Sequence, residues 1–535
     1  MHTCLCFGPL MISVGASLKS LLRSPLLPFA LVIVLLPFGR SAELGTLLCL
    51  LGAVLLLVRE PHALLQHPGA RLLLWLLAGY VAAALVSAPD SIVPGRSWET
   101  VAGLLRYVPL GLYACFALRR ERKLRALYVT VGVVVALWTL DAWLQALTGW
   151  SLGGSAQAER VSGIFGADNL KLGPTLAVLS PFALWTAWRR FGQRGWLLAL
   201  VLMLGPILLA GSRAAWLMYV LVALGFAWHV VGSPRRFALF CAGGAILLAL
   251  GVGVAWHTSE RFQLRVERTL LVLPGSGQSL DTALSGRLAI WRAAAGMIEA
   301  HPFNGVGVRG FRYAYPRQAP AGDHFLVAEP CGVDEGACHA HQLVLEILSE
   351  TGGSGLLLWL AALAVAWRAW RSVGVVARAR AFPVTLALAV MLFPFNTHLA
   401  FYSAWWGLLF AWLLGLWCAA LFVEPSVSGT EELARPHELS SVREGGRHRR
   451  RAGRVLARPG ARGSVRFDRC QRDHGQAPER GERCRDPVAR PPVARHQAVR
   501  RKAPAGGGRT HKGRSFPLPP VVALSTRARH RVAGS

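Results

Sequence analysis

The chain reads SGRLAIWRAAAGMIEAHPFNGVGVRGF at residues 285–311 and HAHQLVLEILSETGGSGLLLWL at residues 339–360. These segments belong to the one long polar interval in a body otherwise made of apolar runs. Ionisable side chains are costly in or beside a membrane, so a cluster of them predicts a functional site. The ionisable residues of this interval include Arg287, Arg292, Arg309, Arg312, His339, His341, Glu346 and Glu350.

Composition indicates a polytopic membrane protein. Of the 535 residues, 53% are hydrophobic and 16% are charged, and the mean hydropathy is +0.41. Apolar runs of about 17–25 residues recur, each long enough to cross a hydrocarbon core about 30 Å thick. We therefore predict an all-α polytopic membrane protein with about 12 transmembrane helices. The spans fall near 22–39, 42–58, 71–88, 101–118, 125–147, 170–188, 195–212, 214–232, 236–256, 354–370, 381–397 and 400–423.

Basic residues predict the orientation of these spans. They are concentrated in alternate loops, most densely at Arg119, Arg120, Arg122 and Lys123, whereas the short intervening loops hold isolated ones such as Arg40. Positively charged loops stay on the cytoplasmic side, so both termini are predicted to be cytoplasmic. The long interval from about residue 257 to residue 350 then faces outward, and its arginines need another explanation.

The predicted organisation has four parts. Membrane helices occupy residues 1–256, an outward loop occupies 257–353, further membrane helices occupy 354–423, and an arginine-rich tail occupies 424–535. From Pro425 onward the sequence has no Trp, Tyr, Met or Ile, so it buries too little apolar surface to fold alone. One interpretation is a disordered basic arm at the inner membrane surface; the other is an error in the reading frame. Because much of the formal charge of +30 lies in this tail, the charge is weak support for nucleic-acid binding.

Two local structures are predicted within the polar interval. Residues Gly286–His301 have the pattern of an amphipathic helix that Pro302 ends. Residues Asn304–Gly310 predict a glycine-rich turn that allows close backbone approach to a ligand. The predicted apolar face of the helix consists of Leu288, Trp291, Ala295 and Ile298.

Arg213 and Arg287 are candidates for anion binding. Both lie on the predicted outward side, and two guanidinium groups on one side of a membrane suit a pyrophosphate, because each can bind phosphate oxygens bidentately. The alternatives are an Arg213 that anchors a helix end by snorkelling and an Arg287 that is a solvated residue at a helix start. A helix N-terminus is the less favourable end for a cation, which favours an anionic partner for Arg287.

His339 and His341 are candidates for a general base, since imidazole titrates near neutrality and can take a proton from a hydroxyl. The alternative is a loop histidine that is hydrogen-bonded to backbone. Cys331 and Cys338 are close enough in sequence for a disulfide on an oxidising side. The spacing C-x6-C-H-x-H is not a common zinc pattern, so no metal is predicted. Glu350 is expected to be structural or orienting.

Taken in order, four motifs resemble the O-antigen ligase and polymerase superfamily, the Wzy C-terminal domain family. The resemblance covers about residues 20–423 and is most specific over residues 205–360. The combination of motifs is specific, although no single motif is. They are GSRAAWL at 211–217, RLAIW at 287–291, HPFNGVGVRGF at 301–311 and HAHQLVLEILSETGGSGL at 339–356.

This resemblance implies a glycosyltransferase of the GT-C type in the bacterial inner membrane, with its active site facing the periplasm. Its donor would be a glycan on undecaprenyl pyrophosphate, and its acceptor a hydroxyl of lipid A–core or of a glycan, with no cofactor. Arg213 and Arg287 would hold the pyrophosphate, and His341 would activate the acceptor hydroxyl for inverting attack. The residues expected to contact substrate are His339, Arg292, Arg309 and Arg312. One departure is Gln342, where the family usually has Asn.

Three functions stay open at this point. A ligase that acts on lipid A–core is favoured slightly over a polymerase that extends the glycan. An anion transporter on the same apolar scaffold is the third, although the sequence lacks paired interrupted spans in corresponding halves.

Overall fold

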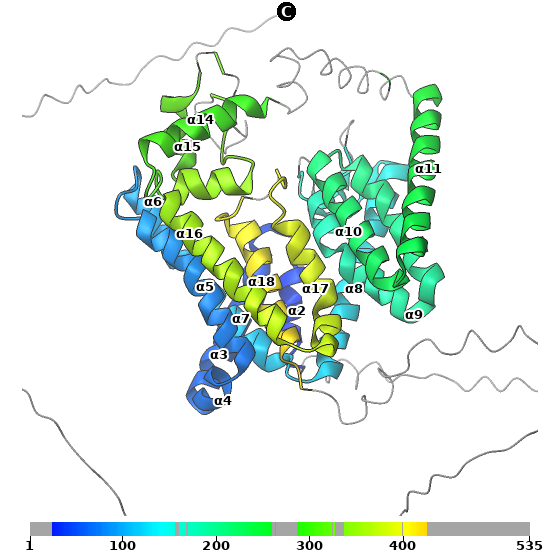
Figure 1. Cartoon of the computed structure of the whole chain (residues 1–535), viewed down its shortest axis with the longest axis horizontal. Coiled ribbons are helices and arrows are strands. Elements are labelled where there is room, and N and C mark those ends of the chain that lie inside the picture. Colours follow the sequence, from blue (N-terminus) through cyan, green and yellow to red (C-terminus); the bar gives the residue numbers. More distant parts are fainter. Residues whose placement is uncertain are drawn as a thin grey trace, which may run out of the picture. The chain divides into compact units, whose positions relative to one another are not determined.

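The computed structural model describes residues 24–155, 160–166, 169–258, 263, 286–320, 322–323, 325–326, 336–397 and 400–424. Over these residues the fold is helical apart from one short antiparallel hairpin, β1 (Trp150–Ser151) with β2 (Gly154–Ser155) (Figure 1). The predicted all-α polytopic class is therefore confirmed. The basic tail from residue 425 onward lies outside the described residues, so its two interpretations both stay open.

The helices follow the chain in this order: α2 (Leu27–Val34), α3 (Ala42–Arg59), α4 (Pro61–Leu65), α5 (Pro68–Ser87), α6 (Pro94–Leu104), α7 (Tyr107–Ala117), α8 (Glu121–Thr148), α9 (Leu172–Leu209), α10 (Arg213–Val231), α11 (Pro234–Thr258), α14 (Arg287–Ala300), α15 (Phe311–Gln318), α16 (Leu343–Ser372), α17 (Val375–Met391) and α18 (Ala404–Leu421). Two 3-10 turns, η1 (Gly39–Ser41) and η2 (Gly163–Phe165), join neighbouring segments.

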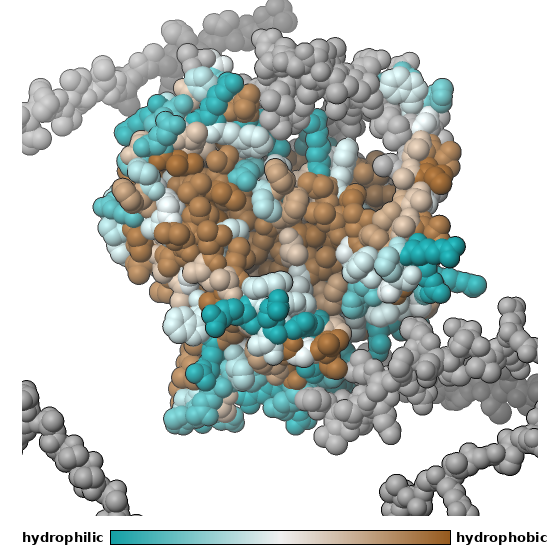
Figure 2. Space-filling model, in the orientation of Figure 1, coloured by the Kyte–Doolittle hydropathy of each residue, from teal (hydrophilic) through white to brown (hydrophobic). Residues whose placement is uncertain are grey.

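Among the described residues, 8 helical segments are long and apolar enough to cross a membrane. In Figure 2, hydrophobic residues form a broad band on the visible face, with hydrophilic residues above and below it. Each predicted span contains helix, but α2 (8 residues) and α17 (17 residues) are not among these 8 segments, so the predicted number of about 12 is not reached among the described residues. The spans near 170–188 and 195–212 share α9, which bends at Gly192. Helix α16 begins at Leu343, well before the predicted span at 354–370, and bends at Gly352.

Helix α18 lies at the centre of the packed helices. Its residues from Trp406 to Leu421 are all buried, and it contacts α7, α17 and α5. Trp412 stacks on Phe29 of α2 with ring centroids 4.9 Å apart, and its indole N–H donates to the Phe29 carbonyl over 2.8 Å. A helix that is apolar on all sides can lie against lipid or against protein, and here neighbouring helices surround it.

The predicted helix at 286–301 is present as α14, but its predicted apolar face was wrong. The indole N–H of Trp291 donates to the Ala340 carbonyl over 3.1 Å, which keeps this ring at the rim. Ala295 is exposed. The buried face is shifted around the helix and packs against α15; it consists of Ile290, Ala293, Ala294 and Met297.

Candidate active site

The glycine-rich turn at 304–310 is hydrogen-bonded to the membrane helices. Val306 N–H donates to the Ser349 carbonyl of α16 over 2.8 Å. The hydroxyl of Ser97 on α6 donates to the Val308 carbonyl over 2.8 Å. A side chain at Gly307 would collide with Ser91, in the α5–α6 connection. The turn therefore closely approaches the protein's own helices and holds α15 against the N-terminal part of α16, while its approach to a ligand stays a prediction.

Two buried carboxylates of α16 accept hydrogen bonds from neighbouring loops. Glu350 is 1% exposed and accepts from the Arg309 backbone N–H over 2.9 Å. One turn earlier, Glu346 accepts through Oε1 from the Phe401 backbone N–H over 2.8 Å, while its Oε2 finds no partner in the described part of the chain. Each carboxylate thus anchors one loop, which agrees with the structural role expected for Glu350.

Arg309 and Arg312 form a cationic pair beside Glu350. Burial and the neighbouring Arg309 lower the pKa of Arg312 to about 10, although Glu350 acts in the opposite direction. The Nε of Arg312 is buried and has no hydrogen-bond partner among the described residues. A partly buried guanidinium with unused donor capacity is suited to an anionic oxygen.

Arg213 and Arg287 lie close together, although 74 positions separate them in the sequence. Each is the first residue of a helix, α10 and α14 respectively. Burial lowers the pKa of Arg287, and the positive charge of Arg213 lowers it further. Two cations meeting at two helix N-termini repel each other and the helix dipoles, and a bound anion would relieve both repulsions.

His341 is held in a defined orientation next to this pair. Its Nδ1 lies 3.0 Å from the Thr397 carbonyl. Because a carbonyl can only accept, Nδ1 carries the proton and Nε2 keeps its lone pair. Burial lowers the pKa of His341 to about 4, and the charge of Arg287 contributes to that shift. The imidazole is therefore neutral at pH 7 and has a basic nitrogen available. The His339 ring lies beside it, with centroids 3.9 Å apart.

Backbone strain coincides with these residues. Among the non-glycine residues that the structure describes, Arg309 (φ 62°) and His341 (φ 51°) have positive φ. Such conformations cost on the order of 1–3 kcal/mol each and persist where the surrounding structure enforces them, often at functional sites. Gln342, which directly follows His341, fixes the start of the next helix. It is the N-cap of α16, and its side-chain oxygen accepts from the Leu345 backbone N–H over 2.5 Å.

The structure brings most of the predicted site residues into two groups. Arg213 and Arg287 lie with the two histidines, whereas Arg309 lies with Arg312 against Glu350. Arg292 is exposed. It follows Arg287 by five residues on one helix, which directs it about 140° away. Sequence reasoning missed Thr397, because a backbone carbonyl has no side-chain signal.

The structure describes one of the two cysteines of the predicted disulfide. Cys338 is disulfide-bonded, while Cys331 lies outside the described residues. The pairing of these two residues stays a prediction.

Comparison with known families identifies this region. Residues 198–360 match the family described as O-antigen ligase, Wzy_C, so the resemblance predicted from the motifs is confirmed over that segment. The matched segment contains Arg213, Arg287, His341 and both buried carboxylates. Among curated proteins, none matches the chain. Together with the membrane helices, the match supports a membrane enzyme of the ligase and polymerase type.

Proposed function

From that family match, we propose that the protein transfers a glycan from undecaprenyl pyrophosphate to a hydroxyl of lipid A–core at the periplasmic face of the inner membrane. The observation that carries the proposal is the meeting of Arg213 and Arg287 beside a neutral, oriented His341. The site then offers two cations for the leaving group and one base for the nucleophile.

Arg213 and Arg287 bind the pyrophosphate of the donor. Guanidinium groups form bidentate hydrogen bonds with phosphate oxygens, and the first turns of α10 and α14 present backbone N–H groups in the same place. Negative charge builds up on the phosphate oxygen as the glycosidic bond breaks, and the same cations stabilise it in the transition state. Arg309 and Arg312, beside Glu350, would bind further acidic groups of donor or acceptor.

His341 activates the acceptor. Its Nε2 takes the proton of the acceptor hydroxyl while that oxygen attacks the anomeric carbon of the donor sugar. The new carbon–oxygen bond forms as the bond from the anomeric carbon to the phosphate oxygen breaks, and the lipid pyrophosphate leaves with that electron pair. Attack from the face opposite the leaving group inverts the configuration. The hydrogen bond from Nδ1 to Thr397 keeps the imidazole in the reactive tautomer.

A transfer assay tests this function. Purified full-length protein in lipid nanodiscs receives undecaprenyl-pyrophosphate-linked glycan and lipid A–core. Arg287→Ala is expected to lower kcat/KM by about 10²–10³-fold, because a donor aimed at developing negative charge is lost. Arg292→Ala, a change of the same residue type on the exposed face of the same helix, should cost far less.

The assay also separates the alternatives. Folded wild-type protein that lengthens the lipid-linked glycan and leaves lipid A–core unmodified would be a polymerase. Absence of turnover with every glycan donor would refute the proposed transfer and favour an anion transporter.

A further inference from the structure

A second group of arginines lies outside the groups assigned to the leaving group and the base. Arg309 and Arg312 adjoin Glu350, and the positive charges of Arg309 and of Arg96 on α6 both act on Arg312. The three residues Arg96, Arg309 and Arg312 are called the second arginine cluster below. They come from α6, from the turn at 304–310 and from α15, so tertiary contacts assemble the cluster.

One hydrogen bond connects α6 directly to the turn that precedes α15. The Ser97 hydroxyl donates to the Val308 carbonyl over 2.8 Å. Arg96 directly precedes Ser97, and Arg309 directly follows Val308. The contact that positions the turn therefore also brings a basic residue of α6 near Arg309.

The second arginine cluster has positive charge that its neighbours do not neutralise by direct pairing. Among the residues that the structure describes, neither Arg309 nor Arg312 forms an ion pair with a carboxylate. The nearby carboxylate of Glu350 accepts instead from the backbone N–H of Arg309, and it also bonds the Phe311 backbone. The guanidinium groups therefore keep donors for a ligand.

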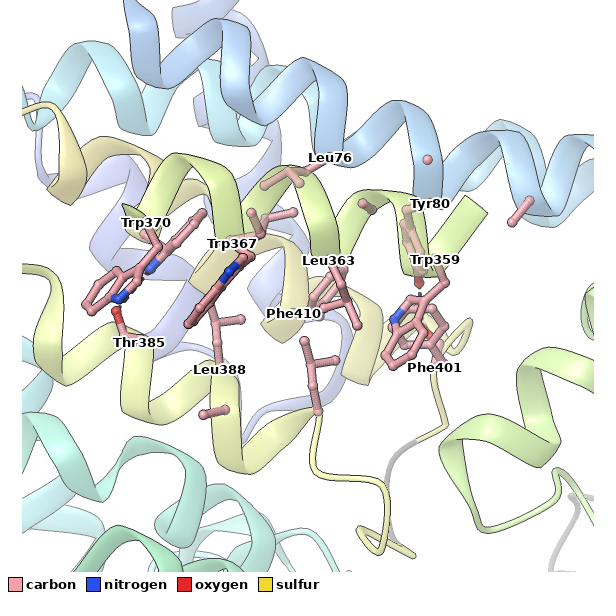
Figure 3. Close-up of a pocket in the computed structure, with 18 of the residues that line it drawn as sticks. Leu76, Tyr80, Trp359, Leu363, Trp367, Trp370, Thr385, Leu388, Phe401 and Phe410 are labelled. Atoms are coloured by element: carbon pink, nitrogen blue, oxygen red, sulfur yellow. Dashed lines mark hydrogen bonds between the residues drawn. The ribbon is translucent and has the colours of Figure 1, made fainter. Parts of the chain in front are cut away.

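Arg309 is the member of the cluster that interacts with buried groups. Its charge acts on Glu346 and on the Tyr80 hydroxyl, and Figure 3 shows Tyr80 at one end of a cavity of about 380 Å³. None of the described residues that line this cavity is charged, so the cavity does not suit an anion. We therefore expect an anion at the two more exposed members, Arg312 and Arg96.

Arg312 and Arg96 each lie in the first turn of a helix, α15 and α6 respectively. The N-terminal end of a helix dipole disfavours a cation, and the two guanidinium groups also repel each other. Arg312 is half-buried, and its Nε has no hydrogen-bond partner within the described ranges. A bound anion would relieve both repulsions, and a guanidinium can bind phosphate oxygens bidentately.

The pair formed by Arg96 and Glu99 does not compete strongly with such a ligand. The two side chains are 2.8 Å apart at their closest atoms, and they are 44% and 69% exposed. Exposed ion pairs of this kind contribute little free energy, because water screens them. Arg96 can therefore turn part of its guanidinium toward a phosphate at Arg312.

The position of the cluster along α16 favours the acceptor as the source of the anion. In the proposed function, Arg213 and Arg287 already bind the pyrophosphate of the donor. From Leu343, the first residue of α16, to Glu350 the helix advances by about 10 Å, so the cluster lies a short way from the loop that carries His341. A short oligosaccharide can span that distance, and an acceptor hydroxyl at His341 is compatible with an anionic group at the cluster.

We propose that the second arginine cluster binds a phosphate group of the acceptor, an inference that rests on the proposed function. Arg312 makes the main contact through its half-buried guanidinium, and Arg96 adds a weaker, exposed one. The cluster thereby selects acceptors that carry a phosphate a short distance from the hydroxyl that receives the glycan. Its residues take no part in bond breaking.

Acceptors with and without phosphate test this proposal. Full-length protein in nanodiscs receives a donor with an uncharged glycan and, as acceptor, either lipid A–core or lipid A–core from which the phosphate groups have been removed chemically. The measured quantity is the ratio of the two acceptor KM values. Arg312→Gln and Arg96→Gln each remove one cation of the cluster. Arg317→Gln is the matched control, because it removes an exposed cation from the same helix, α15.

In wild type, KM is expected to be about tenfold lower for the phosphorylated acceptor, because hydrogen bonds between charged groups are among the stronger ones. In Arg312→Gln this preference should fall to about twofold or less, and in Arg96→Gln to an intermediate value. Arg317→Gln should keep the wild-type preference. Equal KM values for the two acceptors in active wild type, or an Arg312→Gln variant that raises both by the same factor, would overturn the phosphate site and leave the proposed function intact.

A donor with an acidic glycan separates donor from acceptor as the source of the anion. If Arg312→Gln raises KM for the acidic donor and keeps the wild-type preference between acceptors, the cluster serves the donor and the proposal is wrong. If the charge of the donor glycan has the same effect in wild type and in Arg312→Gln, the acceptor assignment is supported.

A binding measurement keeps the two proposals distinguishable. If wild type transfers no glycan, the proposed function fails, and binding of lipid A–core to the full-length protein is then measured in phosphatidylcholine nanodiscs. Phosphate-dependent binding that is lost in Arg312→Gln and kept in Arg317→Gln would support the cluster as a site for this acceptor. Equal binding to all three proteins, or displacement of lipid A–core by phosphatidylglycerol, would contradict it.

Discussion

The two strained loops of the site differ in what they hold. The loop before α16 directs a side chain: His341 has a left-handed backbone, and its imidazole is aimed by the Thr397 carbonyl. The loop before α15 directs the backbone: Arg309 is also left-handed, but the contact that holds it is its own N–H on buried Glu350. The same left-handed backbone therefore orients a reactive side chain in one loop and a backbone hydrogen bond in the other. Substitutions at His341 should mainly lower activity, whereas substitutions at Glu350 should mainly lower stability.

The largest effect is expected at His341. His341→Ala removes the base and should lower kcat by about 10²–10⁴-fold, with little change in the melting temperature of the protein. His339→Ala, on the adjacent ring, should keep most of the activity. Equal loss in both variants would mean that the histidine pair acts as a unit, or that the base is misassigned.

The pH dependence of transfer should reflect the lowered pKa of His341. A base must be neutral to act, so kcat/KM should be constant above about pH 5 and fall about tenfold per pH unit below a pKa of about 4. Arg287→Gln removes a positive charge that lowers this pKa, so its residual activity should fall away at a higher pH than that of wild type. An acid limb near pH 6.5 in wild type would contradict the buried environment of His341. Circular dichroism at each pH checks that the fold persists.

The carboxylates of α16 should show a stability effect of intermediate size. Glu350 accepts from the Arg309 backbone N–H and also bonds the Phe311 backbone, so Glu350→Gln turns an acceptor into a donor that faces an N–H group. We expect a loss of about 1–3 kcal/mol in the free energy of unfolding. Glu346→Gln is the matched change one turn away. It should have a similar cost, because Glu346 also bonds two backbone groups, at Phe401 and Tyr402.

The smallest effect is expected at the N-cap of α16. Gln342→Ala removes the bond to the Leu345 N–H and should destabilise the protein by about 1 kcal/mol. Gln342→Asn keeps the amide with a shorter reach and should retain most of the stability. Thermal unfolding in nanodiscs measures both variants. A large loss of activity in Gln342→Asn at unchanged stability would instead place the amide in contact with substrate.

Much of the fold was predictable from local sequence. The spans, the helix at 286–301 and its end before Pro302 depend on the length of apolar runs and on proline, which act within one segment. The buried face of α14 was not predictable in the same way. Apolar residues lie on more than one side of the helix, and the buried side is the one that packs against Val306, Phe311 and Tyr315 from later in the chain. The turn at 304–310 was predicted, but the neighbours of its glycines were not: Gly307 lies against Ser91, and Gly305 lies against the backbone of Glu350 and Thr351.

The same distinction applies to the candidate site: the sequence predicted some of its features, and the tertiary structure decided the others. Residue types and motif order alone were enough to single out Arg213, Arg287 and His341, because cations, imidazole and their spacing are properties of the chain. Tertiary packing is what brings Arg213 to Arg287, orients the imidazole with the Thr397 carbonyl and places Glu350 against the Arg309 backbone. These features join residues from separate helices through backbone groups and packing angles. Neither can be read from a single sequence.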